Sequence, residues 1–172
     1  MLNYFAYGSN MSVSRLSARV QITRLLGVGT LSRHVLRWHK RSKDRSAKCD
    51  AFFTGNPENR VFGVLYQIDD SQKSRLDRAE GLGHGYLVKA ERIESNNEIV
   101  HAVLYVATPE FIDESLKPYD WYKDHVLLGA REHGLPNHYV KRIEAVHAIP
   151  DPDAERADRE RSIHAARPRR TE

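Results

Sequence analysis

The stretch Tyr4-Phe5-Ala6-Tyr7-Gly8-Ser9-Asn10-Met11 decides the fold of this chain. Its aromatic first half favours a β-strand that stops at the glycine, and a helix-compatible segment follows at 12–19. Glycine permits positive φ and close backbone approach, while serine and asparagine offer hydrogen bonds and helix caps. The stretch therefore predicts a strand, a tight loop and a helix start. Backbone N–H groups in such a loop can converge on a carboxylate or an oxyanion, although an ordinary strand–turn–helix corner fits the same residues.

Length and composition indicate one domain of ordinary type. The 172 residues are enough to bury a core, and 40% hydrophobic with 29% charged residues is typical of globular proteins. The start, Met1-Leu2-Asn3, has no basic region followed by an apolar one, and no stretch approaches the roughly 20 apolar residues that span a bilayer. We therefore expect a cytoplasmic protein without a membrane partner. The single cysteine, Cys49, excludes an intrachain disulfide, and its context favours a non-functional thiol over a nucleophile.

The net charge of +4 is concentrated in one segment. Seven bases lie between Ser32 and Lys48 against one acid, Asp44, and such a patch could attract nucleic acid or another anion. No nucleic-acid-binding module surrounds it, so we expect a solvated basic loop or strand pair and no nucleic-acid partner. The last 22 residues carry six acids and six bases and few apolar side chains. We therefore expect one domain over 1–150 and a charged tail over 151–172, either flexible or docked on the surface.

Turn signals and periodicity divide the body into short strands and helices. The clearest strand is 61–68, which is nearly all apolar and therefore reads as buried on both faces. Gly81 fits a left-handed C-terminal cap for the helix that precedes it. The expected strands are 2–7, 35–38, 51–54, 61–68 and the hairpin pair 86–93 and 99–106, and the expected helices are 71–80, 119–133 and 137–146.

Glu80 is the candidate catalytic residue, because it ends a helix where a carboxylate gains nothing from the helix dipole. It also neighbours a glycine-rich loop and Tyr86, and a carboxylate in such a place can serve as a general base and then as an acid. The alternative interpretation is a solvent-exposed glutamate, as most glutamates are.

Other chemical motifs are missing from the sequence. The spacing of Gly81, Gly83 and Gly85 does not fit a dinucleotide fingerprint, and neither a Walker string nor an HExxH pair occurs. The absence of Gly-x-Ser-x-Gly argues against a nucleophile elbow. We therefore expect no nucleotide cofactor and no metal site. Trp121 and Tyr122, at the start of a helix, are expected to be packing residues.

Three blocks of the chain resemble the γ-glutamylcyclotransferase family. The first is the opening stretch from Tyr4 to Met11. The second joins Phe62-Gly63-Val64-Leu65-Tyr66 to Leu76-Asp77-Arg78-Ala79-Glu80-Gly81 and then Gly85-Tyr86. The third is Gly129-Ala130-Arg131-Glu132-His133-Gly134-Leu135-Pro136-Asn137-His138-Tyr139. The blocks follow the family's order and cover roughly residues 1–147, whereas the basic segment and the tail do not align.

The resemblance implies an α/β protein with a small mixed β-barrel flanked by helices. It also implies catalysis without cofactor or metal on a small γ-glutamyl substrate, with Glu80 as general acid/base. A homodimer and a place in glutathione metabolism are further implications. The residues expected to bind the substrate are Tyr4, Phe5, Ala6, Tyr7, Gly8, Ser9, Asn10, Tyr86 and Tyr139.

The implied reaction is a ring closure that forms 5-oxoproline. The substrate's own α-amine attacks its γ-carbonyl and expels the second amino acid, so the enzyme needs no nucleophile. An alternative is the same cyclisation on another γ-glutamyl compound, such as a γ-glutamylamine or an acylated natural product. The Gly-Ser-Asn loop, in place of Gly-Thr-Leu, argues against the enzymes that act on γ-glutamylamines. A non-catalytic barrel that binds an anion or nucleic acid is the alternative from another class.

Overall fold

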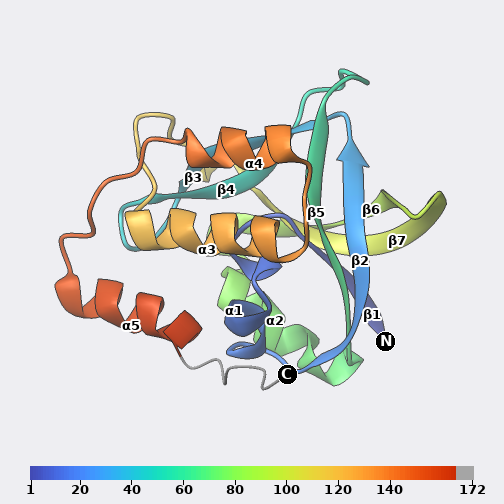
Figure 1. Cartoon of the computed structure of the whole chain (residues 1–172), viewed down its shortest axis with the longest axis horizontal. Helices are drawn as coiled ribbons and strands as arrows, with labels where there is room; N and C mark the ends of the chain where they lie inside the picture. The colour runs from blue at the N-terminus through green and yellow to red at the C-terminus, as the bar shows by residue number, and fades with distance from the viewer. Residues whose placement is uncertain (166–172) are drawn as a thin grey trace.

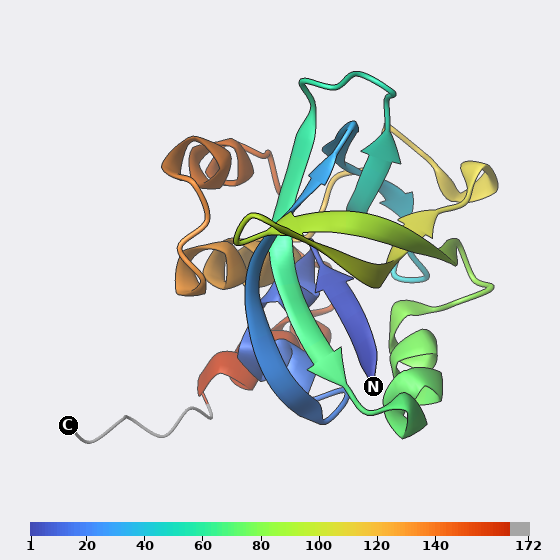
Figure 2. The same cartoon turned by 90° about the vertical axis from the view of Figure 1, so that its right-hand side faces the viewer.

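A closed five-stranded barrel forms the centre of the computed structural model, which describes residues 1–165 (Figures 1 and 2). Around the barrel the strand order is β1-β5-β2-β6-β7. All neighbours are antiparallel except β1 and β7, which run parallel and meet at Tyr4 and Val103. The predicted mixed barrel flanked by helices is therefore confirmed. The bounds are β1 Leu2–Ala6, β2 Ile22–Ser32, β5 Arg60–Ile68, β6 Tyr86–Ser95 and β7 Glu98–Ala107.

The strand β1 lies between β5 and β7 and is buried along its second half. Phe5 fills the barrel interior over two glycines. A Cβ atom on Gly63 would lie 2.7 Å from the Phe5 ring and 2.5 Å from the Ala6 carbonyl oxygen, and one on Gly29 would lie 3.3 Å from the same ring. The small residues of β2 and β5 thus make room for an aromatic side chain. Because side chains alternate along a strand, Tyr4 then points to the other face.

A two-stranded sheet holds the basic segment beside the barrel. Its strands, β3 His34–Arg41 and β4 Ala47–Phe53, are longer than predicted. The pairing shifts register between Trp38 and Lys40, so His39 and Lys40 are both buried instead of alternating. The expected solvated strand pair is therefore wrong at these positions.

The helices cover the barrel and fix its N-terminal loop. Gly129 of α3 lets the helix pack directly on this loop, since a Cβ there would lie 2.5 Å from the Ser12 nitrogen and 2.6 Å from the Met11 Cβ. The helix predicted at 12–19 is shorter and follows a 3₁₀ turn. The helical segments are η1 Ser9–Met11, α1 Val13–Ser17, η2 Asp70–Gln72, α2 Lys73–Glu80, η3 Pro109–Phe111, α3 Asp120–Glu132 and α4 Asn137–Glu144.

The segment expected to be a charged tail contains a docked helix, α5 Ala154–Ala165. It packs on α1 and α3, beside which it lies in Figure 1. Asp151 accepts hydrogen bonds from the indole nitrogen of Trp121 at 2.7 Å and from Arg156, and Glu160 pairs with Arg15. Polar pairs thus hold a helix that offers few apolar residues. The rest of the predicted tail, 166–172, lies outside the described residues.

Across residues 1–165, every helix is too short or too polar to cross a bilayer.

Candidate active site

A small cavity lies where β1, the N-terminal loop and the end of α2 meet, and we call it the inner cavity. Its volume is about 30 Å³. The structure brings Glu80 together there with six of the residues predicted to bind substrate. Phe5 points into the barrel, and neither Phe5 nor Ala6 lines the inner cavity. The lining residues are Tyr4, Tyr7, Gly8, Ser9, Asn10, Cys49, Glu80, Tyr86, Tyr105 and Tyr122.

Glu80 is the last residue of α2, and Gly81 adopts the left-handed conformation predicted for the helix cap, with φ 73°. One carboxylate oxygen, Oε1, accepts hydrogen bonds from the Asn10 amide and from the Tyr4 hydroxyl at 3.2 Å. The guanidinium of Arg19 lies 3.7 Å from the same oxygen. The side chain is only 16% exposed, so the alternative interpretation of a solvent-exposed glutamate is wrong.

Asn10 fixes the orientation of this group. It is almost completely buried, and its amide nitrogen donates both to Glu80 and to the Tyr4 hydroxyl at 3.1 Å. Its amide oxygen accepts from Arg19 at 2.9 Å. With both ends of the amide occupied, Asn10 holds Glu80 and Arg19 in one network.

Tyrosine side chains form the wall of the inner cavity. Tyr86 donates to the Cys49 carbonyl at 2.5 Å, and Tyr122 accepts from the Cys49 backbone nitrogen at 3.0 Å. Burial raises the pKa of Tyr4, Tyr7, Tyr86 and Tyr122 well above the ordinary tyrosine value. These hydroxyls therefore stay protonated at neutral pH. The Cys49 thiol is also buried, and burial raises its pKa, so it stays neutral and a poor nucleophile.

Gly8 is required at the base of this loop because neighbouring side chains approach it closely. A Cβ atom at Gly8 would lie 3.2 Å from the Cys49 Cβ and 3.3 Å from the Tyr122 hydroxyl oxygen. The loop is therefore pressed against β4 and α3, and this contact closes one side of the inner cavity.

A wider cavity of about 210 Å³ adjoins the inner one, and we call it the outer cavity. Ser9, Glu80, Tyr86 and Tyr122 line both, so the catalytic candidate lies at their junction. Two bases of the segment 33–48, Lys40 and Lys48, face the outer cavity instead of bulk solvent. The other residues that line it are Arg15, Arg19, Ser42, Asp44, Ala79, Trp121 and Glu160. Within residues 1–165 we find no group of three or more His, Cys, Asp or Glu residues placed to hold a metal ion.

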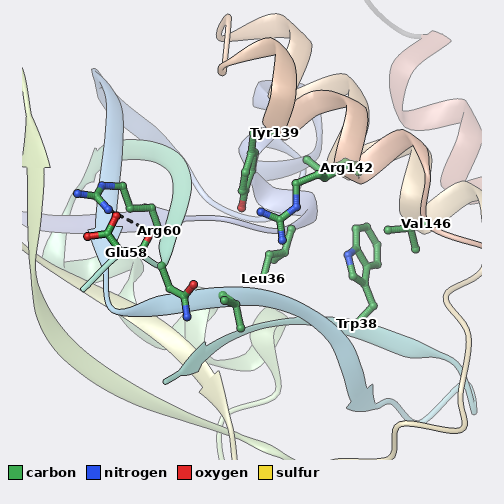
Figure 3. A pocket seen from close by; sticks show the side chains of 10 residues that line it. Leu36, Trp38, Glu58, Arg60, Tyr139, Arg142 and Val146 are labelled. Atoms are coloured by element: carbon green, nitrogen blue, oxygen red, sulfur yellow. Dashed lines mark hydrogen bonds between the residues drawn. The ribbon is translucent and has the colours of Figure 1, made fainter. Parts of the chain in front are cut away.

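Tyr139 lines neither of these two cavities, so the structure does not bring it together with Glu80, and its role in substrate binding stays a prediction. It belongs to α4 and lines a separate hollow of about 220 Å³, together with Trp38 and Arg142 (Figure 3). Its ring packs edge-on against Phe62 at 5.1 Å.

Tyr122 is the residue that the sequence interpretation missed, because it was predicted only to pack. It lines both cavities and contacts β4 through its hydroxyl. One signal was available in the sequence. Tyr122, Val126 and Gly129 are spaced i, i+4, i+7 and share one helix face, and Gly129 belongs to a family block. Since that face packs on the N-terminal loop, Tyr122 also reaches it.

Comparisons with known proteins identify the family of the chain. The model of the AIG2-like family matches residues 60–143. The γ-glutamylcyclotransferase of Bos taurus is 30% identical over 149 residues, which cover 83% of this chain and 77% of that protein, and the Homo sapiens enzyme is 29% identical over the same shares. A solved γ-glutamyl cyclotransferase structure superposes with a TM-score of 0.80 at 24% identity, covering 94% of this chain and 98% of its own, and therefore shows the same fold. The chain belongs to the γ-glutamylcyclotransferase family.

Proposed function

We propose that the protein converts γ-glutamyl-amino acids to 5-oxoproline and a free amino acid, with Glu80 as the general acid/base. The observation that carries this proposal is the position of Glu80. It is largely shielded from solvent, held by Tyr4 and Asn10, and placed between a small cavity and a wider one. A γ-glutamyl group bound at this junction, against the wall of the inner cavity, would present its scissile amide to Glu80.

The inner cavity offers donors for the γ-glutamyl group. Ser9 and Asn10 begin the 3₁₀ turn η1, and the first N–H groups of a helical turn have no acceptor within it. These groups can bind the substrate carboxylate or the oxygen that becomes negative during attack. The tyrosine hydroxyls complete the wall and hold the flexible γ-glutamyl chain bent, with its amine against its own γ-carbonyl. Such orientation of an intramolecular reaction can supply up to about 7–11 kcal/mol of the barrier.

The contacts of Glu80 leave one of its oxygens open for proton transfer. Tyr4, Asn10 and Arg19 all approach Oε1, and among residues 1–165 none of these bonds reaches Oε2. Glu80 takes a proton from the α-amine as the amine attacks the γ-carbon. It then gives that proton to the leaving nitrogen as the amide C–N bond breaks. General acid/base work of this kind typically contributes about 10²–10⁴-fold to the rate.

The test is release of 5-oxoproline from γ-glutamyl dipeptides, γ-glutamylamines and glutathione, measured by chromatography. We expect turnover by the wild type and a loss of about 10²-fold or more in Glu80→Gln, which keeps the shape of the side chain. Glu98→Gln is the matched control, because Glu98 is an exposed residue of the β6–β7 hairpin. Full activity in Glu80→Gln would remove Glu80 from its role.

The substrate panel also tests the alternatives. A preference for a γ-glutamylamine or an acylated compound would keep the reaction and change the substrate. Absence of turnover on every compound would favour the non-catalytic, anion-binding barrel. The cytoplasmic location, the homodimer and the place in glutathione metabolism stay predictions.

A further inference from the structure

Four cations and three carboxylates line the outer cavity, and the cations differ in whether a carboxylate lies beside them. Lys48 lies 2.7 Å from Asp44, and Arg15 pairs with Glu160. Arg19 is held by Asn10 and approaches Glu80. Within residues 1–165, Lys40 forms no ion pair with any carboxylate. The cavity therefore contains one cation without a direct carboxylate partner among the described residues, and Glu80 and Asp44 act on its charge only through space.

Lys40 is buried, with only 5% of its surface exposed. Its ammonium lies 4.5 Å above the centre of the Tyr86 ring and 3.4 Å from the His84 carbonyl oxygen. The stem passes over Gly85, where a Cβ atom would come within 2.8 Å of the Lys40 Cε, so only glycine leaves room for it. An ammonium can donate three hydrogen bonds, and a single long bond to a carbonyl leaves most of that capacity unused. Burial of a charge with so few partners is costly, and burial lowers the pKa of Lys40.

The position of Lys40 in the outer cavity places it beside the leaving part of the substrate. Lys40 lines the outer cavity and not the inner one, whereas Glu80 lines both. If the γ-glutamyl group binds on the inner-cavity side of Glu80 and its scissile nitrogen lies at Glu80, the leaving part extends into the outer cavity. Lys40 is then the buried cation beside the leaving part that has no carboxylate partner of its own.

We propose that Lys40 is a specificity-determining residue that binds a carboxylate on the leaving part of the substrate. The inference rests on the proposed function and deepens it. A leaving amino acid carries a carboxylate one carbon from the scissile nitrogen, and that group satisfies the Lys40 ammonium. A leaving amine has no such group and leaves the ammonium buried and unpaired. Lys48 cannot substitute, because Asp44 and the Ser46 hydroxyl already occupy it.

The experiment compares two substrates that differ only in charge, γ-glutamyl-alanine and γ-glutamyl-alaninamide. We expect the wild type to prefer the acid by about 10- to 100-fold in kcat/KM, as a hydrogen-bonded charge contact implies. Lys40→Gln should lose most of this factor on the acid and much less on the amide, and Lys40→Arg should restore part of the preference. Lys43→Gln is the matched control, because this exposed lysine of the same segment removes an equal charge near Lys40 without lining the cavity.

Three results would overturn the inference. The wild type could turn over acid and amide equally, Lys40→Gln could slow both substrates by the same factor, or Lys43→Gln could abolish the preference as fully as Lys40→Gln. The second result would mean that Lys40 acts on the γ-glutamyl end or on folding, and a melting curve of the variant separates these two. Failure of the proposed function has a different signature, since neither substrate would then release 5-oxoproline with any variant.

Discussion

Asn10 donates from its side-chain amide to the Oε1 oxygen of Glu80, although seventy residues separate them in the chain. The contact joins the loop after β1 to the last turn of α2. It fixes which carboxylate oxygen faces the protein and which faces the cavity. A carboxylate at a helix C-terminus is disfavoured by the helix dipole, and the Asn10 and Tyr4 donors offset part of that cost.

Replacing Asn10 therefore tests whether the orientation of Glu80 matters for the reaction. We expect Asn10→Ala to lower kcat by about 10- to 100-fold, because Glu80 loses one donor and Arg19 loses its acceptor. Steady-state release of 5-oxoproline measures this. Asn3→Ala is a suitable control, since Asn3 lies on the same strand and contacts His101 outside the cavity. Equal loss in both variants would show a general effect of β1 on stability.

A second prediction concerns the space around Gly8. A methyl group at Gly8 would meet the Cys49 Cβ and the Tyr122 hydroxyl, so Gly8→Ala pushes the loop away from both. We expect at least a tenfold fall in kcat/KM with a loss of unfolding free energy of about 1–3 kcal/mol. Adding Cys49→Gly removes the Cβ that the new methyl group meets. The double variant should regain part of the activity, and a double variant slower than Gly8→Ala would contradict this explanation.

The two tyrosines Tyr122 and Tyr139 should behave differently on loss of their hydroxyl groups. Tyr122→Phe removes an acceptor for the Cys49 N–H inside the cavity wall, and we expect a fall in kcat/KM of about tenfold. Tyr139→Phe should leave kcat/KM within about threefold, because Tyr139 lines the separate hollow of Figure 3. Kinetics of the two variants on one γ-glutamyl dipeptide decide the matter. A larger loss in Tyr139→Phe would restore the role that the resemblance implied.

The sequence predicts the elements of the fold where local chemistry is strong. The apolar run 61–68 is β5, Gly81 caps α2, and Asn96 and Asn97 turn the β6–β7 hairpin with positive φ. The first residues of the strands and the β-bulges could not be predicted from local sequence. The register shift between Trp38 and Lys40 depends on how β3 pairs with β4, and no local sequence pattern indicates it.

The candidate site was predictable where its residues lie in the sequence blocks shared with the family. Six of the predicted positions, from β1, the N-terminal loop and β6, come together with Glu80. The inward direction of Lys40 and the place of Tyr122 depend on how separate elements pack, which sequence spacing alone does not encode. The docking of α5 was also not predictable, since it is held by polar pairs such as Arg15–Glu160 and adds only the small Ala157 side chain to the apolar core.

The last prediction concerns acid stability at the contact between α3 and α5. His125 is 1% exposed, and burial lowers its pKa to about 4, although Glu160 accepts a hydrogen bond at 3.3 Å. The groups that face it are Arg15, Glu160 and His164. In the unfolded chain the pKa is about 6.5, so the unfolded state binds more protons between these two values. The contribution of His125 to the free energy of unfolding is therefore complete above about pH 6.5 and is lost as the pH falls toward 4.

Urea unfolding at pH 7.5 and at pH 5 measures this contribution, and His125→Gln should lose less unfolding free energy than the wild type between these two pH values. An equal loss in the two proteins would assign the acid sensitivity to other groups.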